Sequence, residues 1–143
     1  MKIQDVMNRH VEFASPDEPV TELAVTMGDL DVGSLPIGTP EDPKGVVTDR
    51  DILYRVVARG LDASQVRACD VMSSPLISCR AEDSFQTAMD MMTAHRVRRL
   101  AVTQGGGGAV VGWVTLADLA RTLLLESGTV QSAVREITRE TAG

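Results

Sequence analysis

Gly-Val-Val-Thr-Asp-Arg-Asp-Ile, residues 45–52, is the stretch that decides the fold of this chain. A short apolar run opens into Thr-x-x-Asp, and a helical pattern follows. The same arrangement returns at residues 112–119, which read Gly-Trp-Val-Thr-Leu-Ala-Asp-Leu. Thr115 follows Thr48 by 67 residues, and Asp118 follows Asp51 by the same 67. A period of that size in a chain of 143 residues predicts two copies of one structural unit.

Further segments repeat at a spacing of 65 residues. Asp5-Val6-Met7 returns as Asp70-Val71-Met72, and Leu35-Pro36-Ile37 returns as Leu100-Ala101-Val102. Each copy also has a short strand-like piece, at residues 11–14 and 76–79, followed by a helix with apolar residues at i, i+3, i+4 and i+7. Each unit is therefore expected to run strand, helix, strand, strand, helix.

The two units are expected to form one α+β molecule, because about 65 residues make a marginal core alone. We expect the two small sheets to stack face to face, with repeat 1 at residues 1–67 and repeat 2 at 68–126. The closing helices of the repeats are predicted to bury the following side chains: Ile52, Leu53, Val56, Val57, Leu119, Leu123 and Leu124. Residues 127–143 form a tail in which Val130, Val134 and Ile137 predict an amphipathic helix.

Net charge, hydropathy and cysteine spacing argue against several classes of function. A net charge of −6 disfavours nucleic-acid binding, which needs a basic surface. No run of about 18 apolar residues predicts a membrane span, and residues 1–5 carry no apolar signal core, so a cytoplasmic protein is expected. Cys69 and Cys79 lack metal-ligand spacing and are expected to be idle or buried thiols.

The repeated segments together resemble the tandem cystathionine β-synthase (CBS) domain pair, also called a Bateman module. The resemblance covers about residues 1–126 and rests on the paired Asp-Val-Met segments, the Leu-Pro-Ile and Leu-Ala-Val segments, and the two Gly-x-Val-Thr-x-x-Asp motifs. The family usually has Leu-Pro-Val where this chain has Leu100-Ala101-Val102. The resemblance implies two βαββα-type repeats packed sheet to sheet with pseudo-two-fold symmetry, here as a stand-alone module.

Thr-x-x-Asp has two readings. A Thr at a helix N-cap with an acid three residues later is typical of a capping box, which needs no ligand. In the family that the chain resembles, the Thr and the Asp bind the phosphate and the ribose of adenosine-containing ligands. The resemblance therefore makes Thr48, Asp51, Thr115 and Asp118 candidate ligand-binding residues. It also implies an adenine site among residues of the first strands: Val11, Phe13, Leu76, Ile77 and, as a polar contact, Ser78.

A phosphate beside these carboxylates needs cations. The dense basic cluster, residues 95–99, offers Arg98 and Arg99 as phosphate ligands, with Arg50 as a further candidate. Its alternative reading is a solvated helix end. Copy one has Gly33 and Ser34 at the positions of the two arginines, so the sequence predicts one stronger phosphate site rather than two equal ones.

No residue pattern points to catalysis or to a required cofactor, so a non-enzyme is expected. The leading hypothesis is a regulatory module that binds AMP, ADP, ATP or an S-adenosylmethionine-like ligand and signals to an unidentified protein. The alternative is a structural module with empty clefts that acts through homodimerisation. A third idea is a redox or metal sensor that uses Cys69 and Cys79.

Overall fold

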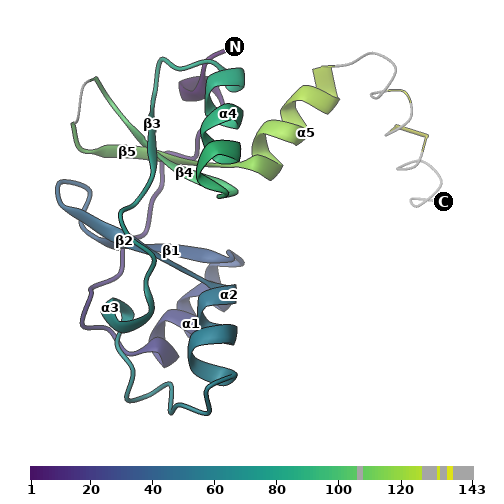
Figure 1. Cartoon of the computed structure of the whole chain (residues 1–143). Coiled ribbons are helices and arrows are strands. Elements are labelled where there is room, and N and C mark those ends of the chain that lie inside the picture. Colours follow the sequence, from purple (N-terminus) through teal and green to yellow (C-terminus); the bar gives the residue numbers. More distant parts are fainter. Residues whose placement is uncertain (106–107, 127–131, 133–134, 137–143) are drawn as a thin grey trace.

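The computed structural model describes residues 1–105, 108–126, 132 and 135–136, and the predicted tail helix lies largely outside them. Figure 1 shows two α/β layers joined through their sheets. The first layer contains α1 (Val20–Leu30), β1 (Ser34–Gly38), β2 (Pro43–Thr48), α2 (Asp49–Ile52), its π-helical continuation η2 (Leu53–Val57) and α3 (Ala68–Val71). The second contains η1 (Ile3–Asp5), β3 (Ser78–Arg80), α4 (Phe85–His95), β4 (Arg99–Thr103), β5 (Val110–Thr115) and α5 (Leu116–Glu126).

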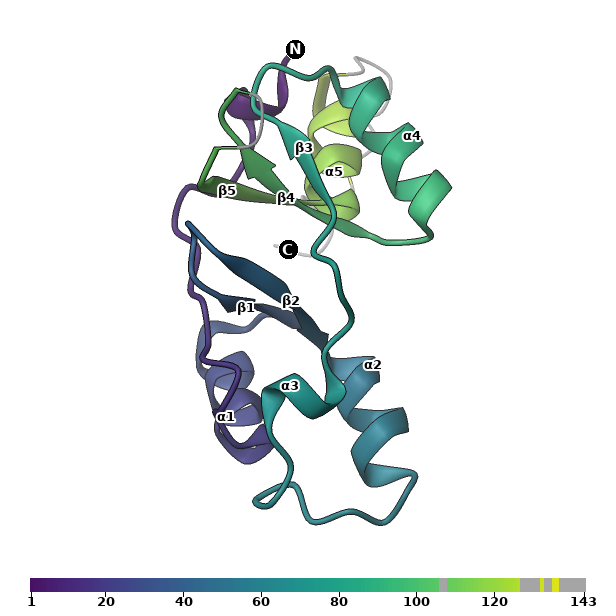
Figure 2. The ribbon, with the colours of Figure 1, turned by 60° about the vertical axis from the view of Figure 1, so that its left-hand side comes forward.

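The two sheets face each other and the helices cover their outer sides. β1 pairs antiparallel with β2, and the other sheet has the order β3-β4-β5. In Figure 2 the helices α1, α2 and α3 lie beyond the first sheet, and α4 and α5 lie beyond the second. The expected α+β architecture of two repeats packed sheet to sheet is confirmed. No helix in the described part of the chain combines the length and the apolar character needed to cross a bilayer.

The first strand of the two repeats differs, and one residue explains the difference. Repeat 2 forms β3 as expected, but residues 11–14 make only an isolated bridge between Ala14 and Ile37. Ala101 donates its N–H to the carbonyl of Ile77 at 3.0 Å. The corresponding residue of repeat 1 is Pro36, which has no N–H to extend the ladder. The expected strand at residues 11–14 was therefore wrong, except for the bridge.

The start of each repeat crosses to the opposite sheet. Asn8 pairs with Trp113 of β5, and Ser73 pairs with Val46 of β2. A Cβ atom at the motif glycine of β5 would lie 2.5 Å from the sulfur of Met7, and one at the motif glycine of β2 would lie 2.5 Å from the carbonyl oxygen of Ser73. The glycine of Gly-x-Val-Thr thus gives the crossing segment room to pass.

Each crossing segment also fills the core of the other layer. Ile3 and Met7 pack with Phe85, Leu100 and their neighbours in the second layer. Ala68 and Val71 pack with the apolar side chains of the first layer. The two layers therefore depend on each other for a complete core.

The closing helices bury less than the pattern predicts. Val56 and Leu119 are buried, and Ile52 is half-buried. The predicted burial was wrong for four side chains, which are exposed: Leu53, Val57, Leu123 and Leu124. Helical periodicity shows which residues share a face, but not how wide a strip of that face the sheet covers. The uncovered strip leaves apolar side chains in solvent on η2 and on α5.

Candidate functional site

Both Thr-x-x-Asp motifs form the capping boxes that the structural reading predicts. The N–H of Asp51 donates to Thr48 Oγ1 at 3.0 Å, and the N–H of Thr48 donates to Asp51 Oδ2 at 2.9 Å. Thr115 and Asp118 make the same pair of bonds at 3.1 and 3.2 Å. The caps do not use up these groups, because each Thr hydroxyl still has a proton to donate and each carboxylate has a second oxygen.

The second carboxylate oxygens differ between the repeats. Asp51 Oδ1 lies 3.8 Å from Arg55 Nη1, and the Asp51 side chain is only 12% exposed. Asp118 Oδ1 accepts a hydrogen bond from Arg121 Nη2 at 2.6 Å, and the Asp118 side chain is 29% exposed. A ligand hydroxyl at Asp118 would share that oxygen with a guanidinium, whereas Asp51 keeps an oxygen without such a short bond.

Two clefts lie between the layers, and each combines one motif with segments of the other repeat. The cleft that we call cleft 1, about 460 Å³, contains Thr115 and Asp118 together with repeat-1 segments at residues 8–12 and 30–36. Cleft 2, about 490 Å³, contains residues 48–51 together with repeat-2 segments at 73–77 and 96–99. Both volumes fall within the range of small-molecule sites, about 300–1,000 Å³.

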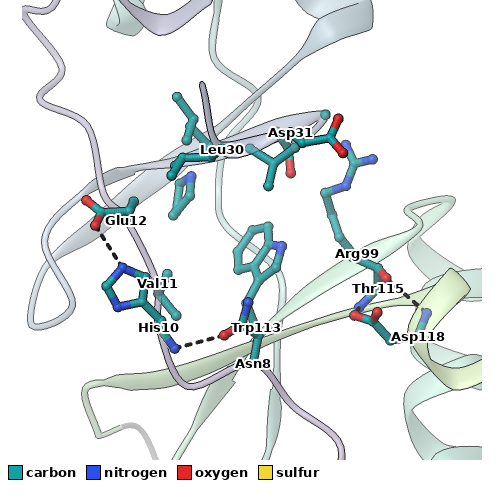
Figure 3. Close-up of a pocket in the computed structure, with 15 residues that line it drawn as sticks. Asn8, His10, Val11, Glu12, Leu30, Asp31, Arg99, Trp113, Thr115 and Asp118 are labelled. Carbon is teal, nitrogen blue, oxygen red and sulfur yellow. Dashed lines mark hydrogen bonds and ion pairs between the residues drawn. The ribbon is translucent and has the colours of Figure 1, made fainter. Parts of the chain in front are cut away.

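The charges of the two clefts are opposite. Among the described residues, cleft 1 has three carboxylates, from Glu12, Asp31 and Asp118, and one guanidinium, from Arg99. His10 also lines this cleft, with Nε2 placed 3.0 Å from Glu12 Oε1 (Figure 3). Cleft 2 has four guanidiniums against two carboxylates, and its arginines are Arg50, Arg96, Arg98 and Arg99. A phosphate is therefore favoured in cleft 2 and disfavoured in cleft 1.

One pair of equivalent positions shows the difference most clearly. Asp31 follows α1 with φ of 54°, and Arg96 follows α4 with φ of 56°. Both are left-handed caps, and in each case the next residue donates its N–H back into the helix at 3.0 Å. Such caps usually carry Gly. The chain instead places a carboxylate at the edge of cleft 1 and a guanidinium at the edge of cleft 2.

Arg99 is the cation that both clefts share. Burial lowers the pKa of its guanidinium, and the nearby Asp49 and Asp51 carboxylates act in the opposite direction. Its Nε is buried and has no hydrogen-bond partner among the described residues. A buried donor without a partner carries a desolvation cost that a bound anion could offset.

Most of the site residues predicted from sequence lie in the clefts. Cleft 1 contains Val11, Arg99, Thr115 and Asp118. Cleft 2 contains Thr48, Arg50, Asp51, Leu76, Ile77, Arg98 and Arg99. Phe13 and Ser78 line neither cleft. Ser78 is adjacent to Ile77 in extended chain and therefore faces the opposite way, while residues 11–14 lack the regular strand from which Phe13 was placed.

Sequence reasoning missed several cleft residues. Trp113 extends its indole into cleft 1, as Figure 3 shows, although it stands inside the repeated motif. A large aromatic residue at the variable position of that motif was the available signal. Asp31 and Arg96 stand 65 residues apart, and Arg96 belongs to the basic cluster at residues 95–99, but the positive φ that makes them helix caps is visible only in the structure.

Within the described residues, no three His, Cys, Asp or Glu side chains are grouped to hold a metal ion.

Two crossed α/β repeats with motif-bearing clefts between them define a CBS pair, and the chain belongs to the CBS domain family. The sequence model of the CBS domain matches residues 3–58 and 68–125. The CBS domain-containing protein YhcV of Bacillus subtilis is 36% identical over 118 residues, which cover 82% of each chain. Hypoxic response protein 1 of Mycobacterium tuberculosis is 36% identical over 121 residues, which cover 84% of this chain and 83% of the relative.

A solved structure agrees with this assignment. Hypoxic Response Protein I, crystallised with two coordinated zinc ions, matches with a TM-score of 0.73 and 34% identity. The match covers 85% of this chain and 98% of that one. The chain is thus a CBS-pair module, a kind of unit that is generally regulatory and often binds ligands.

Proposed function

We propose that this CBS pair is a regulatory module that binds an adenosine nucleotide in cleft 2 and signals to a partner protein. The observation that carries the proposal is the set of four guanidiniums around the Thr48–Asp51 motif. The guanidiniums attract a phosphate, and the Thr48 hydroxyl can donate to one of its oxygens. Asp51 Oδ1, which lies 3.8 Å from Arg55 Nη1, can accept from a ribose hydroxyl, and Leu76 and Ile77 offer apolar contact to a base.

The charge pattern also ranks the candidate ligands. AMP, ADP and ATP carry the anionic groups that cleft 2 would bind. An S-adenosylmethionine-like ligand has no phosphate and suits cleft 2 less well. Binding would change the partner's activity by favouring one packing of the two layers, since a ligand shifts such an equilibrium by its differential affinity for the two states. The proposal includes no catalytic step.

Calorimetry and thermal denaturation with AMP, ADP, ATP and adenosine test the proposal. At roughly 100 to 1,000 times the dissociation constant, the bound nucleotide should stabilise the protein by about 3 to 4 kcal/mol. Arg98→Gln should weaken AMP binding and leave adenosine binding unchanged. Arg59→Gln removes the same charge from an exposed residue outside both clefts and serves as the control. If no nucleotide changes the melting curve, or if both variants act alike, the proposal is wrong.

A second candidate function is self-association, favoured by the exposed apolar strips on the closing helices. Val57 on η2 is 62% exposed and Leu124 on α5 is 51% exposed, and further apolar side chains accompany them. Burying such residues between two copies would stabilise a homodimer. The variant Val57→Lys/Leu124→Lys should then sediment as a monomer. Val25→Lys, on the exposed side of α1, is the matched control and should leave a dimer intact.

A further inference from the structure

The two clefts are separated by a thin wall. Gly33 lines cleft 1 and Asp49 lines cleft 2. The two residues touch, because the Asp49 N–H donates to the Gly33 carbonyl at 2.9 Å. A Cβ at Gly33 would lie only 3.3 Å from Asp49 Oδ2. Groups bound on the two sides of this wall would therefore lie close to one another.

Arg99 comes to this wall from the opposite layer. It begins β4, where it pairs with Thr115 of cleft 1, while its charge is near Asp49 and Asp51 of cleft 2. In Figure 3 its side chain extends across cleft 1 toward the level of Asp31 in the first repeat. The equivalent residue of repeat 1 is Ser34, so the chain has a single guanidinium in this position rather than a symmetric pair.

We infer that Arg99 is a shared phosphate ligand, so that phosphate-bearing ligands in the two clefts compete for one guanidinium. The inference rests on the proposed nucleotide binding and adds a regulation to it. A nucleotide in cleft 2 draws the guanidinium to its own phosphate. Cleft 1 then presents its carboxylates without that guanidinium and binds a second nucleotide about tenfold more weakly, a coupling within the usual range.

The single tryptophan of the chain makes this measurable. Trp113 lines cleft 1, so its indole N–H resonance reports binding there. AMP is titrated into the wild type and into Arg50→Gln, since Arg50 is exposed and lines only cleft 2. Weakening cleft 2 should release Arg99, so the AMP midpoint at Trp113 should fall by several fold. Simple loss of a positive charge would raise that midpoint instead.

Two controls isolate the shared guanidinium. In an Arg99→Gln background, Arg50→Gln should leave the Trp113 midpoint for AMP unchanged. Adenosine has no phosphate, so its midpoint at Trp113 should be the same in the wild type and in Arg50→Gln. An AMP midpoint that is unchanged or raised in Arg50→Gln overturns the inference, as does AMP binding confined to cleft 2. The proposed function fails separately, if AMP shifts no resonance of the protein.

Discussion

Asp31 and Arg96 cap their helices in the same left-handed conformation but carry opposite charges. Replacing each by glycine therefore changes the backbone strain in the same direction and the charge in opposite directions. We predict that Asp31→Gly stabilises the protein clearly and that Arg96→Gly stabilises it little. Glycine removes a left-handed strain of roughly 1–2 kcal/mol at Arg96 and about 1 kcal/mol at Asp31, because Asp tolerates this conformation better than most residues. It adds about 0.5–1 kcal/mol of unfolded-state entropy, which offsets part of that gain.

The helix dipole separates the two variants. A carboxylate at a helix C-terminus is unfavourable and a guanidinium is favourable, each by about 0.3–1 kcal/mol. Asp31→Gly should therefore raise the free energy of unfolding by about 0.5–1 kcal/mol, and Arg96→Gly by about 0–0.5 kcal/mol. Urea denaturation without ligand measures both values, and an unchanged m-value shows that the unfolded states remain comparable.

Ligand binding should follow the opposite order. Arg96 lines cleft 2 at an exposed position, so its removal should weaken AMP binding by up to about fivefold, the upper value for an exposed ion pair. Asp31→Gly should leave AMP binding in cleft 2 within about twofold, because Asp31 lines cleft 1. Equal stabilisation by the two variants would refute the dipole argument. Equal effects on AMP would refute the assignment of the phosphate to cleft 2.

Four further predictions concern the caps, the core and the thiols. Thr48→Ala should lower the free energy of unfolding by about 1 kcal/mol, because it removes the hydroxyl that accepts a hydrogen bond from the Asp51 N–H; urea denaturation measures this. Leu119→Ala should cost about 3 kcal/mol, since Leu119 is fully buried, whereas Leu124→Ala should change stability by less than about 0.5 kcal/mol if the monomer is measured. Burial raises the pKa of the Cys79 thiol from its ordinary 9.0 to about 11, so the unfolded state ionises first and stability should fall as pH rises from about 9 to about 11. A thiol reagent at pH 8 should modify the exposed Cys69 and spare Cys79, and mass spectrometry of the labelled protein checks this.

The architecture could be predicted because local sequence patterns determine it, and each of these patterns occurs twice in the chain. The 67-residue spacing of the Thr-x-x-Asp motifs indicates duplication, and each motif caps a helix through contacts only three residues apart. Such short-range chemistry can be read directly from the sequence. The loss of the first strand in repeat 1 could also have been read there, because Pro36 cannot donate to a ladder.

The make-up of each cleft could not be predicted in the same way. The segments that lie beside Thr48 and Thr115 are determined by the pairing of residues 73 and 8 with the opposite sheets. That pairing joins residues that are far apart in the chain. For the same reason, the sequence could name Arg98 and Arg99 as a basic pair but could not place Arg99 between two clefts. Long-range packing, rather than any motif, determines these positions.

The most direct test of the central claim is a crystal structure of the protein grown with AMP. The phosphate should lie in cleft 2, within hydrogen-bond distance of the Arg98 or Arg99 guanidinium, with a ribose hydroxyl on Asp51. AMP seated only beside Thr115 and Asp118, or crystals that contain no nucleotide at saturating AMP, would contradict the account.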